Sequence, residues 1–190
     1  LQFEPLFHNF TFKGMEIITT SLSKATDLII LDAAELKIKK CHVEQGTKII
    51  TANASLNEKN ERLTIKLSKK IKGKAKLCIR FTGVLNDRLL GFYKSQYKDN
   101  KGKTKYLATT QFEAADARRA FPCWDEPAVK ATFDVSLLVD RHHDAISNMP
   151  VISKKTVDSK ILYKFGRTPI MSTYLLYLGV GEFEYLHGRL

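Results

Sequence analysis

Strict alternation of apolar and polar residues is the feature that most constrains the fold of this chain. In residues 74–81, Ala, Leu, Ile and Phe occupy every second position, and Lys, Cys and Arg lie between them. Successive side chains of a β-strand point to opposite faces, so this period of two predicts a strand with one buried face. The same pattern recurs in residues 63–67, 133–139 and 161–165, with further β-rich runs at 15–22, 27–31 and 174–180. An all-β antiparallel sandwich or curved sheet is therefore expected.

Two local signals refine this expectation. Asp99-Asn100-Lys101-Gly102 is typical of a turn and predicts a long hairpin that joins residues 92–97 to 105–112. The Ala-rich segment 114–120 favours a short helix of at most about two turns, because Pro122 stops it. Asp116 and Arg119 would meet at helical spacing. With no repeat or linker, residues 1–190 are interpreted as one domain.

The charge of the chain raises nucleic acid as a partner. Lys plus Arg outnumber Asp plus Glu by 31 to 20, for a net charge of +11. The lysines, however, alternate along predicted strands (Lys37 and Lys39, Lys74 and Lys76) or lie in the turn at 98–105, where a solvated face and edge protection put them. No RNP-type aromatic pattern, recognition helix or Cys/His finger accompanies them. We therefore expect no nucleic-acid partner, and a basic nucleic-acid-binding β-domain remains an alternative.

Metal-binding and nucleophile motifs are missing from the sequence. The histidines show no HExxH or similar spacing; they are His8, His42, His142, His143 and His187. His142 and His143 are expected to be solvated in a turn. Neither GxSxG nor a glycine-rich phosphate loop is present, and Cys123 is interpreted as a small core residue.

The setting of the protein is expected to be cytoplasmic. No apolar run approaches the roughly 20 residues that span a bilayer, so no membrane partner is expected. Cys41, Cys78 and Cys123 lie far apart, which favours a reducing compartment over a disulfide framework. Because the sequence starts at Leu1 rather than Met, we expect it to be a piece of a longer protein.

One strand end could carry chemistry. If residues 109–113 are extended, Thr109, Gln111 and Glu113 share one face and Phe112 packs on the other. An amide and a carboxylate would then lie side by side where the chain turns into the short helix. A Glu in this position is often only a solvated or salt-bridged residue, and Arg118 and Arg119 are near enough in sequence to pair with it.

Residues 110–127, TQFEAADARRAFPCWDEP, closely resemble the signature of the gluzincin zinc aminopeptidases, which include the puromycin-sensitive, aminopeptidase N and tricorn-interacting factor types. The likeness extends to GFY at 91–93, AISNMP at 145–150 and MSTYLL at 171–176, so it covers nearly the whole chain in order. Trp124 stands where many members have Phe, a change between two aromatic packing residues.

The resemblance implies that residues 1–190 form the saddle-like N-terminal β-domain of such an enzyme. In the family this domain packs on a thermolysin-like catalytic domain, whose HExxH helix and GAMEN loop supply zinc and substrate contacts. Neither motif occurs here, and Arg189-Leu190 would lie close to where that domain follows. This chain alone is therefore expected to bind no zinc and to be inactive.

The resemblance also implies roles for site residues. Glu113 matches the acidic residue that binds the α-ammonium group of peptide substrates, and Gln111 matches a residue that lines the pocket for the first side chain. A carboxylate about 4 Å from an ammonium gains roughly 4 kcal/mol at an effective dielectric constant near 20. The other polar signature residues are interpreted as an ion-pair and turn network that holds the strand end: Asp116, Arg118, Arg119, Asp125 and Glu126. A non-catalytic interaction scaffold is the main alternative, although the presence of both Gln111 and Glu113 speaks against it.

Overall fold

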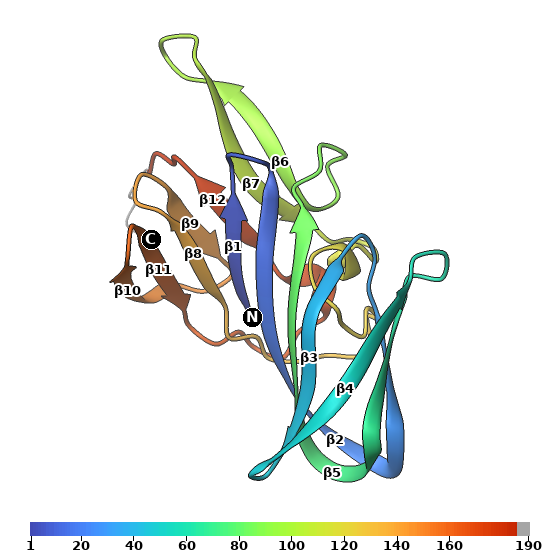
Figure 1. Cartoon of the computed structure of the whole chain (residues 1–190). Coiled ribbons are helices and arrows are strands. Elements are labelled where there is room, and N and C mark those ends of the chain that lie inside the picture. The colour runs from blue at the N-terminus through green and yellow to red at the C-terminus, as the bar shows by residue number, and fades with distance from the viewer. Residues whose placement is uncertain (186–190) are drawn as a thin grey trace.

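Two twisted sheets make up the computed structural model, which describes residues 1–185 (Figure 1). The first sheet has the spatial order β10-β11-β8-β1-β2-β5-β3-β4 and the second the order β6-β7-β12-β9. The strands of the first sheet are β1 (Gln2–Leu6), β2 (Thr11–Asp32), β3 (Lys37–Gln45), β4 (Lys48–Asn57), β5 (Arg62–Val84), β8 (Ser136–Asp140), β10 (Val151–Val157) and β11 (Lys160–Phe165). Those of the second are β6 (Gly91–Lys98), β7 (Thr104–Gln111), β9 (Asp144–Ser147) and β12 (Leu178–Gly181).

The predicted all-β sandwich is confirmed, although its strands are not all antiparallel. β1 pairs in parallel with β8, through Gln2↔Ser136 and Phe3↔Leu137. The helical turns η1 (Ala117–Arg119) and η2 (Thr173–Leu175) each comprise three residues, and no helix within residues 1–185 has the length and apolarity to cross a membrane. His187 and the expected boundary at residues 189–190 lie outside the described part of the chain.

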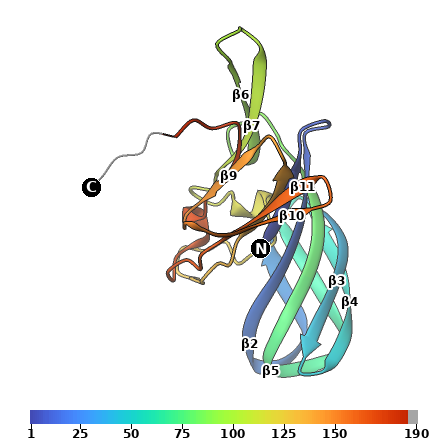
Figure 2. The same ribbon diagram turned by 90° about the vertical axis from the view of Figure 1, so that its left-hand side faces the viewer.

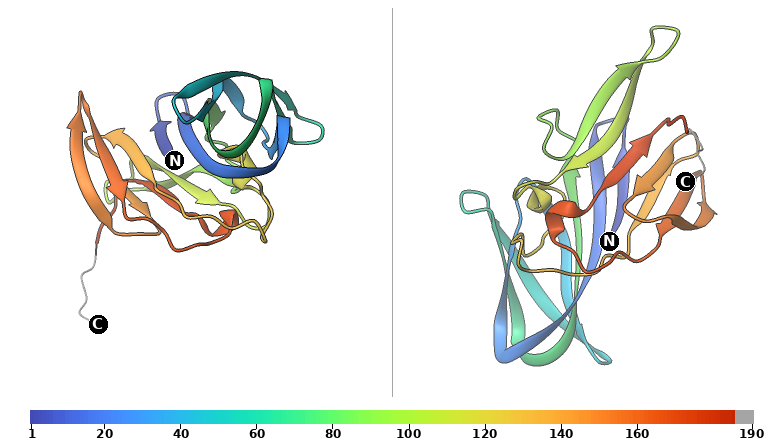
Figure 3. Two further views of the ribbon diagram at one scale, coloured as in Figure 1. Left: turned by 90° about the horizontal axis from the view of Figure 1, so that it is seen from below. Right: turned by 180° about the vertical axis from the view of Figure 1, so that it is seen from behind.

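The long strands β2 and β5 form the spine of the first sheet. They pair from Thr11↔Val84 to Asp32↔Arg62, with register shifts between Leu22 and Thr26 and again before Leu28. The β-rich runs predicted at 15–22 and 27–31 are thus two parts of one bent strand. One half of β5 pairs with β3 and the other with β4, so this end of the sheet curls round (Figure 3). The alternating lysines Lys37, Lys39, Lys74 and Lys76 are exposed on it, as predicted.

Phenylalanine side chains join the two sheets. The ring of Phe3, on β1, lies 5.8–6.2 Å from the rings of Phe12, Phe81, Phe92 and Phe121. Phe92 comes from the second sheet and the others from the first sheet or the turn after η1. Burial of each such ring stabilises the fold by about 1.5–3 kcal/mol. The predicted inward face of β5 is confirmed, since Ala75, Leu77, Ile79 and Phe81 are all buried.

The predicted hairpin is confirmed as β6 and β7, which project beyond the rest of the molecule (Figures 1 and 2). The strand prediction for residues 174–180 is largely wrong, because only Leu178–Gly181 form β12 and the residues before it include η2. Side chains replace the sheet partners there. Asn148 accepts from the N–H of Tyr177 and donates to the carbonyl of Leu175, each at 2.8 Å, and the Thr110 hydroxyl accepts from Leu178 N–H at 3.0 Å.

Candidate functional site

The end of β7 presents a polar pair around a buried ring. Phe112 is 1% exposed and its ring lies 6.0 Å from that of Phe121, whereas Gln111 and Glu113 are both exposed. Gln111 is the last residue of β7 and pairs with Gly91 on β6; Glu113 lies just beyond the strand, and its peptide bond to Ala114 is cis. The predicted alternation of exposed and buried side chains therefore continues past the strand end, with Phe112 anchoring the segment.

The segment after Glu113 is shorter in helix than predicted. Only Ala117–Arg119 are helical, as a 3₁₀ turn, although residues 114–120 were expected to give up to about two turns. Asp116 N–H bonds back to the Phe112 carbonyl at 2.9 Å, which closes a turn before the helix begins. The predicted Asp116–Arg119 contact is confirmed at 2.8 Å.

Arg118 does not pair with Glu113. Its Nε lies 3.1 Å from Oδ2 of Asp125, which also accepts from the Arg118 backbone N–H, and its Nη1 lies 3.2 Å from Glu61. Burial opposes its charge, but the bond with Asp125 and the neighbouring carboxylates raise the pKa of Arg118. Its guanidinium is thus held by carboxylates on the side of the first sheet.

Arg119 is occupied in the same way. Besides Asp116, its guanidinium contacts Glu35 at 2.7 Å and Glu61 at 2.8 Å. The two carboxylate oxygens of Glu61 thus each take one arginine. Gly91 lies directly against this side chain: a Cβ built there would meet Arg119 Cβ at 2.9 Å, and the φ of Gly91 is +68°.

Asp125 connects the segment that follows Glu113 to the end of β2. Its N–H donates to Oδ2 of the buried Asp32 at 2.9 Å, and its Oδ1 accepts from the hydroxyl of Thr173 at 2.8 Å. Asp32 and Cys123 exchange backbone hydrogen bonds of 2.7 and 3.0 Å. The expected ion-pair network therefore exists for Asp116 and Asp125 with the two arginines. Among the described residues the exposed Glu126 side chain takes no part in it.

This network leaves the carboxylate of Glu113 without a cationic partner among the described residues. Within residues 1–185, its exposed carboxylate makes no ion pair and no side-chain hydrogen bond, while both nearby arginines are filled by other acids. A carboxylate in this position can accept a cation from outside the chain.

Polar groups beside the end of β7 extend this face. The hydroxyl of Tyr177 lies 3.1 Å from that of Thr109 on β7, and Ser147 Oγ donates to the Tyr177 carbonyl at 2.8 Å. No pattern in the sequence singles out Tyr177. Its position depends on the pairing of β12 with β7, which alternation alone does not specify.

The cysteine and histidine predictions have mixed outcomes. Cys123 is buried as predicted, and burial raises the pKa of its thiol well above the ordinary value. The prediction that His142 and His143 are both solvated is wrong for His143, which is 7% exposed. The predicted turn is present at residues 141–142. The rings of His142 and His143 have centroids 4.0 Å apart, and His143 packs on Phe7 at 4.5 Å.

Comparison with known proteins gives consistent matches. The Peptidase M1 N-terminal domain model matches residues 1–175. Puromycin-sensitive aminopeptidase of Caenorhabditis elegans is 42% identical to this chain, over all of this chain and 20% of that protein. Aminopeptidase M1-D of Oryza sativa subsp. japonica is 39% identical over 93% of this chain and 20% of that protein, and Aminopeptidase 2 of Candida albicans 40% over 98% and 20%. The chain thus spans about a fifth of the length of the curated relatives it matches.

Proposed function

The chain belongs to the peptidase M1 family, whose N-terminal domain it matches, and from this premise we propose that it anchors the substrate in a zinc aminopeptidase. In this proposal, Glu113 binds the α-ammonium group of a peptide and Gln111 lines the pocket for the first side chain. The observation that carries the proposal is the exposed carboxylate of Glu113, which has no partner among the described residues although two arginines follow it closely in the chain.

The charge of Glu113 would favour peptides bound through their free amino terminus. A free amino terminus offers a full positive charge, whereas an internal peptide bond offers a neutral amide. Attraction at about 4 Å amounts to roughly 1 kcal/mol in bulk water and 4 kcal/mol at an effective dielectric constant near 20. This preference would fix the cleaved bond one residue from the free end, which is the definition of an aminopeptidase.

The residues at this strand end do not fit the catalytic zinc that the family implies. Gln111 and Glu113 supply one carboxylate and an amide, and a zinc site of this kind needs three protein ligands, most often including histidine. Among the described residues, His142 and His143 gather with Glu182, but Glu182 contacts Lys105, which lies six positions before Gln111 on β7, roughly 20 Å along a strand. The proposal therefore assigns zinc to a thermolysin-like domain of a longer protein.

The test is Glu113→Gln in the longer enzyme, measured on peptides with a free and with an acetylated amino terminus. The Coulomb range above predicts that kcat/KM for the free peptide falls by roughly five-fold to nearly a thousand-fold. Zinc content, measured by atomic emission, should not change. Preference for the free over the acetylated peptide should shrink by a similar factor.

Glu126→Gln is the matched control, because Glu126 is also exposed and its side chain is free of ion pairs among the described residues. Its kinetics should equal those of the unaltered enzyme. Unchanged kinetics in Glu113→Gln would remove the anchoring role, and an enzyme with no peptidase activity at all would favour the scaffold alternative.

A further inference from the structure

A second group of ligand atoms lies on the outer face of the first sheet, apart from the strand end described above. His42 on β3 and Cys78 on β5 are direct cross-strand partners, and Glu44 follows His42 by two residues on the same face. The nitrogen, sulfur and carboxylate atoms of these three side chains all lie within 4.8 Å of one another.

The spacing suits a tetrahedral ion. Zinc bonds to nitrogen and oxygen of about 2.0–2.2 Å place two such ligands roughly 3.4 Å apart at a tetrahedral angle. His42 Nε2 and Glu44 Oε1 are 3.5 Å apart. The backbone register fixes His42 opposite Cys78, so little rearrangement would be needed to bring three ligands onto one ion.

The chemistry of the group also suits zinc. Imidazole nitrogen, thiolate sulfur and carboxylate oxygen are its usual protein ligands. All three side chains are partly buried, and those of His42 and Glu44 are 24% and 41% exposed, so a water molecule can reach a fourth position.

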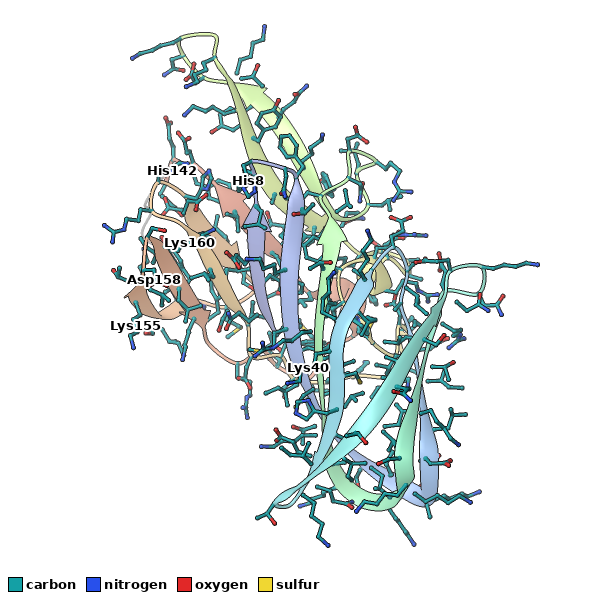
Figure 4. The ribbon with its side chains drawn as sticks, in the orientation of Figure 1. His8, Lys40, His142, Lys155, Asp158 and Lys160 are labelled. Atoms are coloured by element: carbon teal, nitrogen blue, oxygen red, sulfur yellow. The ribbon has the colours of Figure 1, made fainter. Side chains whose placement is uncertain are left out.

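A competing group, His142, His143 and Glu182, is less suited. Both oxygens of Glu182 are bonded to Lys105 Nζ, at 2.7 and 2.9 Å, and the His143 ring is packed on Phe7. A metal would have to displace a lysine there. Figure 4 shows His142 and Lys40 on well-separated parts of the molecule, and Lys40 is two residues before His42 in the chain. The two groups can therefore be tested separately.

We propose that His42, Glu44 and Cys78 bind Zn²⁺, with water as the fourth ligand, and that the ion cross-links β3 and β5. This revises the expectation that the chain by itself binds no zinc. Sequence patterns missed the site because its ligands come together through cross-strand pairing and not through a short motif. The site is independent of Glu113 and of the proposed aminopeptidase function.

The test is titration of the reduced, metal-free chain with Co²⁺, which reports thiolate ligation through a near-ultraviolet charge-transfer band and tetrahedral geometry through intense visible bands. One equivalent of Co²⁺ should saturate both signals, and one equivalent of Zn²⁺ should abolish them. No peptide substrate is involved, so the outcome does not bear on the role of Glu113.

Variants locate the ligands. Cys78→Ser should remove the charge-transfer band, and His42→Gln and Glu44→Gln should each weaken binding by at least about tenfold. Cys41→Ser is the matched control, since Cys41 pairs with Ile79 next to the site and burial raises its pKa to about 11. Circular dichroism in chelator verifies that each variant is folded.

Three results would overturn the proposal: no charge-transfer band in the unaltered chain, a band that survives Cys78→Ser, or a band that Cys41→Ser removes. Loss of binding in His142→Gln would instead assign the ion to the competing group. Because His42→Gln and Glu44→Gln leave all thiols in place, they decide the matter even if Cys78→Ser fails to fold.

Discussion

Replacement of Asp125 by Asn should cost stability out of proportion to the size of the change. The Asp125 side chain is 1% exposed and accepts bonds from Arg118 and from Thr173. Removal of one partner from a buried ion pair costs about 3–5 kcal/mol. Here Arg118 keeps Glu61 at 3.2 Å and Asp32 at 3.7 Å, and Asn can still accept one bond, so we expect a loss of about 2–3 kcal/mol in the free energy of unfolding.

Urea unfolding followed by far-ultraviolet circular dichroism measures this loss, with an unchanged m-value to show that the folded state is otherwise intact. For a chain of this size the melting temperature should fall by about 4–12 °C. Glu126→Gln, one residue along and exposed, should stay within about 0.5 kcal/mol of the unaltered chain. Equal losses in the two variants, or a loss below about 0.5 kcal/mol for Asp125→Asn, would refute the reasoning.

Two further substitutions probe other parts of the fold. Gly91→Ala should lower the free energy of unfolding, measured by calorimetry, by about 1–3 kcal/mol, because φ is +68° and the new Cβ meets Arg119. Gly102, at φ +75°, has open space around it, so Gly102→Ala should show only the smaller cost of the backbone conformation. Equal costs in the two variants would contradict the contact with Arg119. Burial raises the pKa of Glu16 well above its ordinary 4.5, so ionisation in the unfolded state removes stability as the pH rises from 4.5 through the folded-state pKa. Urea midpoints of Glu16→Leu should exceed those of the unaltered chain by a margin that widens over that pH range; a margin that does not change with pH would show that Glu16 does not titrate in this way.

Much of the architecture could be predicted because it depends on local alternation. The inward face of residues 75–81 and the exposure of Gln111 and Glu113 around Phe112 both follow from a period of two. The hairpin at Asp99 followed from turn chemistry. The resemblance, and not the alternation, supplied the role of Glu113.

What could not be predicted depends on contacts between distant segments. The parallel pairing of Gln2 with Ser136, the burial of His143 against Phe7 and the meeting of His42 with Cys78 join residues far apart in the sequence. Side chains also replaced sheet partners before β12, where Asn148 binds the backbone of Leu175 and Tyr177. Period and propensity describe single segments and do not specify such partners.

The parallel pairing of β1 with β8 also means that the first sheet cannot be completed until late in the synthesis of this segment. Ser136 is added to the growing chain long after its partner Gln2, so one edge of β1 has no strand to pair with in the meantime. At about 5–20 residues per second this delay lasts on the order of ten seconds. An unpaired strand edge is a template for the wrong neighbour. A nascent chain of this protein would therefore be most vulnerable to aggregation, and most dependent on chaperones, before β8 has emerged.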